Sequence, residues 1–148
     1  MIAKTSACLL GILLCLLCGG FIQSAWAYST DDLKRLKATG SCPRCDLSAA
    51  TLDELQLFRS NLSGANLSGA NLSRTNLIAA DLSRADLSGA ILSGANLSGA
   101  DLSSANLSTA ELLETELTLV DFSGAKLERA SLEKANLLKA KLPNADLS

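Results

Sequence analysis

Leucine recurs at every fifth residue along most of this chain, and that period restricts what the chain can fold into. From Leu47 to Leu147 the phase is unbroken, with Leu at 20 of 21 positions and Phe122 at the other. Two residues before each of these positions the chain carries Ala in 15 of the 21 cases. Helical side chains return to one face about every 3.6 residues and strand side chains about every 2. A period of five requires a different backbone shape.

Two inward positions in each five, one large and one small, predict a short extended segment followed by a corner. Four corners close a square, and stacked coils can pair their backbones as parallel strands do. Gly and Ser after the central residue suit corners, because Gly tolerates positive φ and Ser bonds locally to turn backbone. We therefore expect an all-β solenoid with this core stack: Leu62, Leu67, Leu72, Leu77, Leu82, Leu87, Leu92, Leu97, Leu102, Leu107 and Phe122.

The unit ANLSG, at residues 65–69 and again at 95–99, resembles the pentapeptide-repeat family. The resemblance extends over residues 45–148 in a single phase. Members of that family fold as a right-handed quadrilateral β-helix, so the resemblance implies this handedness and agrees with the square coil. With four units to a coil, the 21 units predict about five coils.

The first 27 residues have the pattern of an export signal. Lys4 provides a short basic start, residues 7–22 are apolar, and the AWA sequence at 25–27 offers small residues for cleavage. An uncleaved membrane anchor is the alternative, but the apolar run is shorter than the roughly 20 residues of a spanning helix. We expect no stable membrane insertion once the signal is removed.

This pattern divides the chain into a signal peptide at 1–27, a capping helix with linker at 28–44, and the repeat at 45–148. Asn-Leu-Ser occurs five times, and glycans at that density on neighbouring turns would crowd one another in a eukaryotic secretory pathway. A bacterial exporter fits better. We predict export to a periplasm, or to a thylakoid lumen as the resemblance to secreted cyanobacterial members implies.

The segment at 28–44 carries the signals of a short helix. Ser29 or Thr30 can cap it, two Asp residues follow in the first turn, and Gly40 can end it. The terminal coil of a stack exposes apolar side chains and unpaired backbone groups. We therefore expect the helix to cover the N-terminal end of the rod.

Cys42 and Cys45 are the two cysteines that follow the signal segment. Exported proteins reside in oxidising compartments, so a structural disulfide that holds the helix to the rod is expected. A redox-active C-x-x-C pair is the alternative, although its usual setting at a helix N-terminus is missing. A zinc site would need two further ligands, and the chain has no His. We predict no metal and no cofactor.

One outward column departs from the Asn and Ser background. Sorting residues twenty apart places Phe58, Ile78 and Leu138 on one face, with Leu119 at the adjoining corner. These four residues form a candidate partner-binding patch. The alternative is ordinary surface, with Phe58 and Ile78 contacting only the N-terminal helix.

A second column stacks Asp81, Asp101 and Asp121 between Asn61 and Lys141. Stacked carboxylates can hold a cation such as Ca²⁺. A flat ladder lacks the convergent oxygen cage that calcium requires, so we expect these carboxylates to be solvated.

The composition argues against an enzyme. His is absent, which removes the usual general base, and a core filled by Leu and Ala leaves no room for a ligand cavity. Residues 28–148 carry twelve basic and fifteen acidic side chains, a charge of −3 without a block of one sign that would suggest nucleic acid. We predict a non-enzymatic interaction module whose protein partner the sequence does not specify.

Two other functions remain open. Some members of the resembling family mimic duplex DNA and bind DNA gyrase, which is cytoplasmic, and the C-x-x-C pair could act as a redox sensor. The last coil also lacks a capping segment within the sequence, so an end-to-end homodimer through the C-terminal coil is expected.

Overall fold

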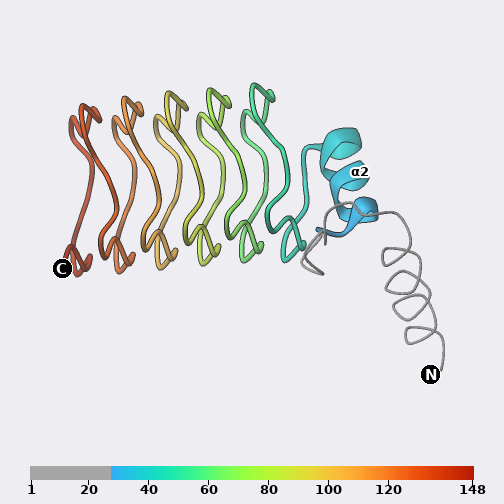
Figure 1. The fold of residues 1–148 in the computed structure, drawn as a ribbon. Helices are drawn as coiled ribbons and strands as arrows, with labels where there is room; N and C mark the ends of the chain where they lie inside the picture. Colours follow the sequence, from blue (N-terminus) through green and yellow to red (C-terminus); the bar gives the residue numbers. More distant parts are fainter. Residues whose placement is uncertain (1–27) are drawn as a thin grey trace, which may run out of the picture.

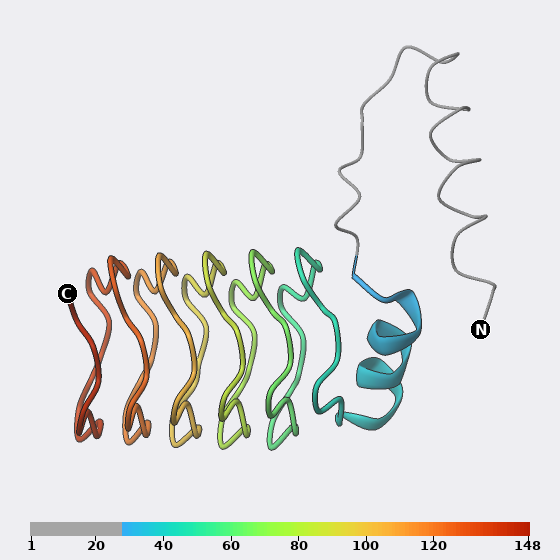
Figure 2. The same cartoon turned by 90° about the horizontal axis from the view of Figure 1, so that it is seen from below.

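The computed structural model describes residues 28–148, so the predicted signal peptide, its cleavage site and three of the five cysteines lie outside the described residues. Within them the chain winds into a straight stack of coils, with helix α2 (Thr30–Thr39) at one end and the C-terminus at the other (Figures 1 and 2). No helix among residues 28–148 combines the length and apolar character needed to cross a bilayer.

Backbone pairing follows a spacing of twenty residues. Isolated parallel β-bridges, and no longer strands within residues 28–148, join each coil to the next, from Ser41 with Asn61 to Lys126 with Asp146. Each junction has bonds in both directions: Leu47 N–H donates to Asn66 O at 2.8 Å, and Asn66 N–H donates to Cys45 O at 2.8 Å. Four five-residue units therefore complete one coil.

The corners place the second residue after each central side chain in the left-handed region. Six Gly and fifteen other residues hold this position, including the β-branched Thr109 at φ 59°. Side chains before the corner stabilise it: Ser63 N–H and Oγ both donate to Asn61 Oδ1, at 3.1 and 2.7 Å. A left-handed conformation costs an L-residue roughly 1–2 kcal/mol, so the stacking bonds must offset this strain at most corners.

The core is a column of Leu filled in by Ala. Leu62 to Leu107 at every fifth position, together with Phe122, are all 0% exposed. Burial decreases toward the C-terminal end, where Leu142 is half-buried and Leu147 is 60% exposed. Interior coils have a neighbour on both sides, whereas the last coil of the described residues has one.

Three buried polar side chains replace Ala at small inward positions. Thr75 Oγ1 donates to Leu52 O at 2.8 Å, and Thr115 Oγ1 donates to Leu92 O at 3.0 Å. The Ser60 hydroxyl is buried without a hydrogen-bond partner. Because an unsatisfied buried hydroxyl is destabilising, Ser60 is a weak point in the core.

Helix α2 begins where the sequence places a cap. Ser29 Oγ accepts a hydrogen bond from Asp32 N–H at 3.2 Å, and Gly40, at φ 65°, closes the helix through its N–H to Leu36 O. Leu36 is 1% exposed and belongs to the core. These contacts orient one face of α2 toward the first coil.

The first coil receives from α2 the bonds that a preceding coil would otherwise supply. Ser29 N–H donates to Asp46 O at 3.0 Å, and Asp46 N–H donates to Asp32 Oδ2 at 3.0 Å. In the next coil, the corresponding groups of Asn66 bond to Leu47 N–H and Cys45 O. At this unit, α2 therefore satisfies the exposed backbone edge of the stack.

Candidate functional site: the helix–disulfide junction and the outer faces

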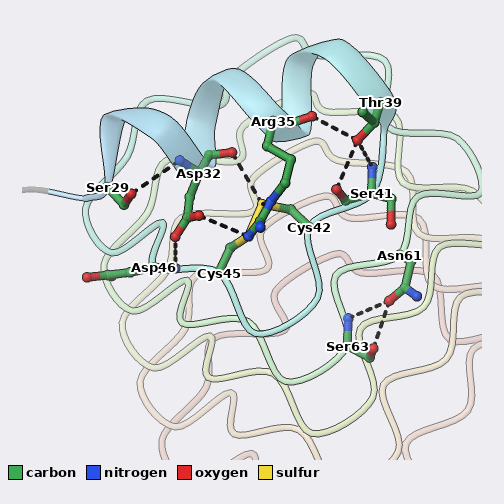
Figure 3. The surroundings of a disulfide bond; sticks show 10 residues. All are labelled: Ser29, Asp32, Arg35, Thr39, Ser41, Cys42, Cys45, Asp46, Asn61 and Ser63. Atoms are coloured by element: carbon green, nitrogen blue, oxygen red, sulfur yellow. Dashed lines mark hydrogen bonds and ion pairs between the residues drawn. A yellow bond between two sulfur atoms is a disulfide. The ribbon is translucent and has the colours of Figure 1, made fainter.

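The junction between α2 and the rod contains a buried disulfide. Cys42 and Cys45 are joined with their Cα atoms 5.5 Å apart, and they are 0% and 1% exposed (Figure 3). Cys45 occupies a small inward position, and Cys42 occupies a central one, five residues before Leu47. Together the two residues fill the inward positions of the first coil that Leu and Ala fill in most later units.

The coil register begins one unit before the predicted boundary at residue 45. Ser41 already bridges to Asn61, and the next residue, Cys42, is 0% exposed. The leucine pattern does not reveal this unit, because Cys takes the place of Leu at its central position. The sequence indicates the unit only through the spacing of Cys42, which stands five residues before Leu47.

Arg35 also lies at this junction, although no pattern in the sequence indicated it. Its Nη2 lies 2.6 Å from Cys45 Sγ and its Nε lies 3.4 Å from Cys42 Sγ. The same Nη2 donates to Asp32 Oδ1 at 2.9 Å. Figure 3 shows the Arg35 side chain reaching from α2 across the two sulfurs. The i, i+3 pairing with Asp32 is readable from a helix, but the contact with the sulfurs requires the tertiary structure.

Three potential metal ligands meet at the same place. Ligand atoms of Asp32, Cys42 and Cys45 lie within 4.8 Å of one another. The Arg35 guanidinium contacts all three, so a positive charge is already present beside the group. Metal coordination requires thiolates, and the two sulfurs here are bonded to each other. The arrangement is a charge-flanked disulfide.

The candidate patch divides into two apolar pairs. Leu119 and Leu138 are 57% and 61% exposed and lie on neighbouring coils, with Leu119 N–H bonded to Leu138 O at 2.9 Å. Phe58 is 51% exposed beside Ile78, which is half-buried rather than exposed because coils flank it on both sides. The Arg59 guanidinium lies 4.8 Å from the centre of the Phe58 ring and covers part of it. The Leu119–Leu138 pair is therefore the more accessible one.

The Asp carboxylates of the second column accept hydrogen bonds from Ser residues at the corners. Asp81 bridges to Asp101, which bridges to Asp121, and Asp121 forms an ion pair with Lys141 at 3.7 Å. Hydrogen bonds from the Ser123 hydroxyl and backbone lower the pKa of Asp121, and the Lys141 charge lowers it further. These oxygens stabilise turns and do not converge on a common centre.

Two hollows lie at the surface of the described residues. One of about 290 Å³ lies between α2 and the coil beside Leu55. The other, of about 380 Å³, is lined by the side chains Ser108, Thr109, Glu128, Arg129 and Ser148.

The family model for pentapeptide repeats matches residues 42–77, 56–94, 80–118 and 115–148, with eight copies of the repeat. The chain belongs to the pentapeptide-repeat family. The match begins at residue 42, which agrees with the register that places Cys42 inside the first coil. The predicted family is therefore confirmed.

Two solved structures are similar to this pentapeptide-repeat chain over most of its length. One is a pentapeptide repeat protein (Rfr23) from the cyanobacterium Cyanothece 51142, 26% identical, covering 80% of this chain and 99% of that one, with a TM-score of 0.62. The other is alr5209, a pentapeptide repeat protein from Nostoc PCC 7120, 32% identical, covering 81% of this chain and 99% of that one, with a TM-score of 0.61. No curated protein compared with the chain matches it.

These matches confirm the predicted fold class of right-handed β-helix. In a pentapeptide-repeat rod of this kind the interior is solid, because inward Leu and Ala fill it.

Proposed function

We propose that this pentapeptide-repeat chain is an exported, non-enzymatic rod that binds another protein through an outer face. The observation that carries the proposal is the Leu119–Leu138 pair, two large apolar side chains on adjacent coils that are both more than half exposed. Side-by-side apolar groups on a polar surface are typical of protein-binding sites. Phe58 lies in the column of Leu138 near the other end of the rod, with half-buried residues between them, and is not part of this pair.

A rigid scaffold supports this function. The backbone is bonded coil to coil along the rod, so the surface is pre-organised and loses little conformational entropy on binding. Catalysis would need a polar cavity, and the core residues leave none between the coils. The absence of His from the whole chain is in keeping with a binding role.

We further propose that the rod comprises about five coils and that α2 caps its N-terminal end. Support comes from the bonds between α2 and Asp46, which replace those of a preceding coil, and from the burial of Leu36. The Cys42–Cys45 disulfide would then fix the first coil beneath the cap. Export rests on the signal pattern at 1–27.

Site-specific photo-crosslinking tests the binding face. A photoreactive side chain is placed at Leu119 or, as the matched control, at Ser104, because both residues occupy corners, at φ 62° and 58°. The full chain is expressed in its own cells and irradiated. We expect one cross-linked protein from position 119 and none from position 104. Equal products from both positions, or none from either, would reject the face as a binding site.

Cell fractionation tests export separately. The proposal expects the protein in an envelope compartment or lumen, shortened by removal of the signal. Recovery of the uncleaved chain from the cytoplasm would refute export and would favour the DNA-mimic alternative, because gyrase is found there.

A further inference from the structure

We propose that the Cys42–Cys45 pair is a site of thiol–disulfide exchange with a dithiol, at which Arg35 stabilises Cys45 as the thiolate. The inference does not depend on the proposed binding function. It rests on the placement of one guanidinium against both sulfurs at the point where α2 meets the rod (Figure 3).

The two sulfurs are not equivalent with respect to the charge. Arg35 Nη2 lies 2.6 Å from Cys45 Sγ, whereas the nearest guanidinium contact of Cys42 Sγ is 3.4 Å. A neighbouring cation favours a thiolate over a thiol. Cys42 Sγ instead lies 3.2 Å from the carbonyl oxygen of Asp32, which disfavours negative charge on that sulfur. Cys45 is therefore the sulfur better suited to leave as a thiolate.

Other charged groups at the junction modulate this preference. The Asp32 carboxylate competes for the same Nη2 at 2.9 Å and opposes a thiolate nearby. On the coil, the Asp46 carboxylate is engaged by Ser48 Oγ at 2.8 Å and by Asn66 Nδ2 at 3.3 Å. The Arg44 side chain is exposed at the first corner. Arg35 and Asp32 thus act on Cys45 in opposite directions.

Access to the disulfide depends on the Arg35 side chain. The cysteines are 0% and 1% exposed, while the Arg35 side chain that crosses them is 52% exposed. Attack on the disulfide requires this long side chain to move aside, while Leu36 and Asp32 keep α2 anchored to the first coil. The guanidinium remains tethered within a side chain's length of the leaving sulfur.

The exchange is balanced in two steps. A thiolate of the dithiol attacks Cys42 Sγ, the bond between Cys42 and Cys45 breaks, and its electron pair leaves on Cys45 as a thiolate beside Arg35. The second thiol of the dithiol then loses its proton and attacks the dithiol sulfur that is bonded to Cys42. The bond between that sulfur and Cys42 Sγ breaks, and Cys42 leaves as a thiolate that takes up the proton. The dithiol is oxidised to a disulfide by two electrons, and the protein pair is reduced.

The test first measures how fast dithiothreitol, a small dithiol, reduces the Cys42–Cys45 disulfide in the folded full chain; we expect reduction that is several-fold slower in Arg35→Gln, and no reduction without unfolding would overturn the proposal. A second measurement gives the thiol pKa of each cysteine in the reduced full chain. Iodoacetamide alkylation is followed across pH, and mass spectrometry of the peptides resolves Cys42 and Cys45 from the other cysteines. We expect Cys45 to react with an apparent pKa below the ordinary thiol value of about 8.5, and Cys42 to react at or above that value. Arg35→Gln should raise the Cys45 pKa by about one unit, a tenfold loss of reactivity at fixed lower pH.

Two further variants separate charge from structure. Asp32→Asn should lower the Cys45 pKa because it removes the competing anion, whereas the control Arg44→Gln should leave it unchanged. Circular dichroism confirms that each reduced variant retains the fold. Shifts of the same sign in Arg35→Gln and Asp32→Asn, or equal and ordinary pKa values for both cysteines, would overturn the proposal and leave a structural disulfide only.

Discussion

Replacing Leu97 by Ala tests whether the stack behaves as a rigid, close-packed core. Leu97 is 0% exposed and is stacked between Leu77 and Leu117, which are also 0% exposed. The substitution removes three buried carbons, a transfer loss of about 2.4 kcal/mol at ~0.8 kcal/mol for each.

The coils cannot close over the resulting cavity because backbone bonds fix their spacing. Leu97 N–H donates to Glu116 O at 2.8 Å, and Leu77 N–H donates to Asn96 O at 2.7 Å. A cavity contribution therefore adds to the transfer loss, and we expect Leu97→Ala to lower the free energy of unfolding by about 3–5 kcal/mol.

Urea denaturation followed by circular dichroism measures this loss. Leu147→Ala is the matched control, since Leu147 belongs to the same leucine phase but is 60% exposed, and we expect it to cost less than about 0.5 kcal/mol. If Leu97→Ala costs under about 1.5 kcal/mol with an unchanged slope, the coils can collapse inward and the reasoning from rigid stacking is wrong.

Three further predictions use the same denaturation assay. Ser60→Ala should stabilise the rod by about 1 kcal/mol because it removes a buried hydroxyl without a partner, and a loss would show that the hydroxyl is satisfied. Thr109→Asn should add about 0.5–1 kcal/mol by relieving the left-handed corner at φ 59°, and no gain would mean that the corner is unstrained. The lowered pKa of Asp121 means that its stabilising contribution is complete above the ordinary value of 3.8 and is lost as pH falls through the lower folded value. Asp121→Asn should therefore flatten the acid limb of the stability curve, and an unchanged limb would contradict this.

Features that repeat in phase along the chain could be predicted from the sequence. The leucine period predicts the square coil, the resemblance of the ANLSG units indicates the family, and the fully buried residues from Leu62 to Leu107 occupy the leucine phase. Helix signals at Ser29 and Gly40 coincide with the observed caps of α2. In each case the relevant contacts lie at a fixed sequence separation, so spacing alone locates them.

The solvent exposure of the outward residues could be predicted only in part from the sequence. Phe58, Ile78 and Leu138 share one column, yet their exposure differs because it depends on which coils flank each position. The pairing of Leu119 with Leu138, nineteen residues apart in the chain, is also visible in the stacking bonds. The position of a residue within the five-residue repeat predicts the face on which it lies. The neighbouring coils determine how much of its side chain is exposed to solvent.

The sequence by itself determined a turn at every fifth residue, because a chain with one large and one small inward residue in every five can bury both only by turning at that interval, and the twenty-residue spacing of the bridges agrees with the predicted four turns per coil. The tertiary structure alone decided the chemistry of the N-terminal junction. Arg35 lies ten residues before Cys45 on a helix outside the repeat, and no period relates the two. Their contact arises from the packing of Leu36 and the bonds of Asp32 to the first coil, which bring the guanidinium over the disulfide.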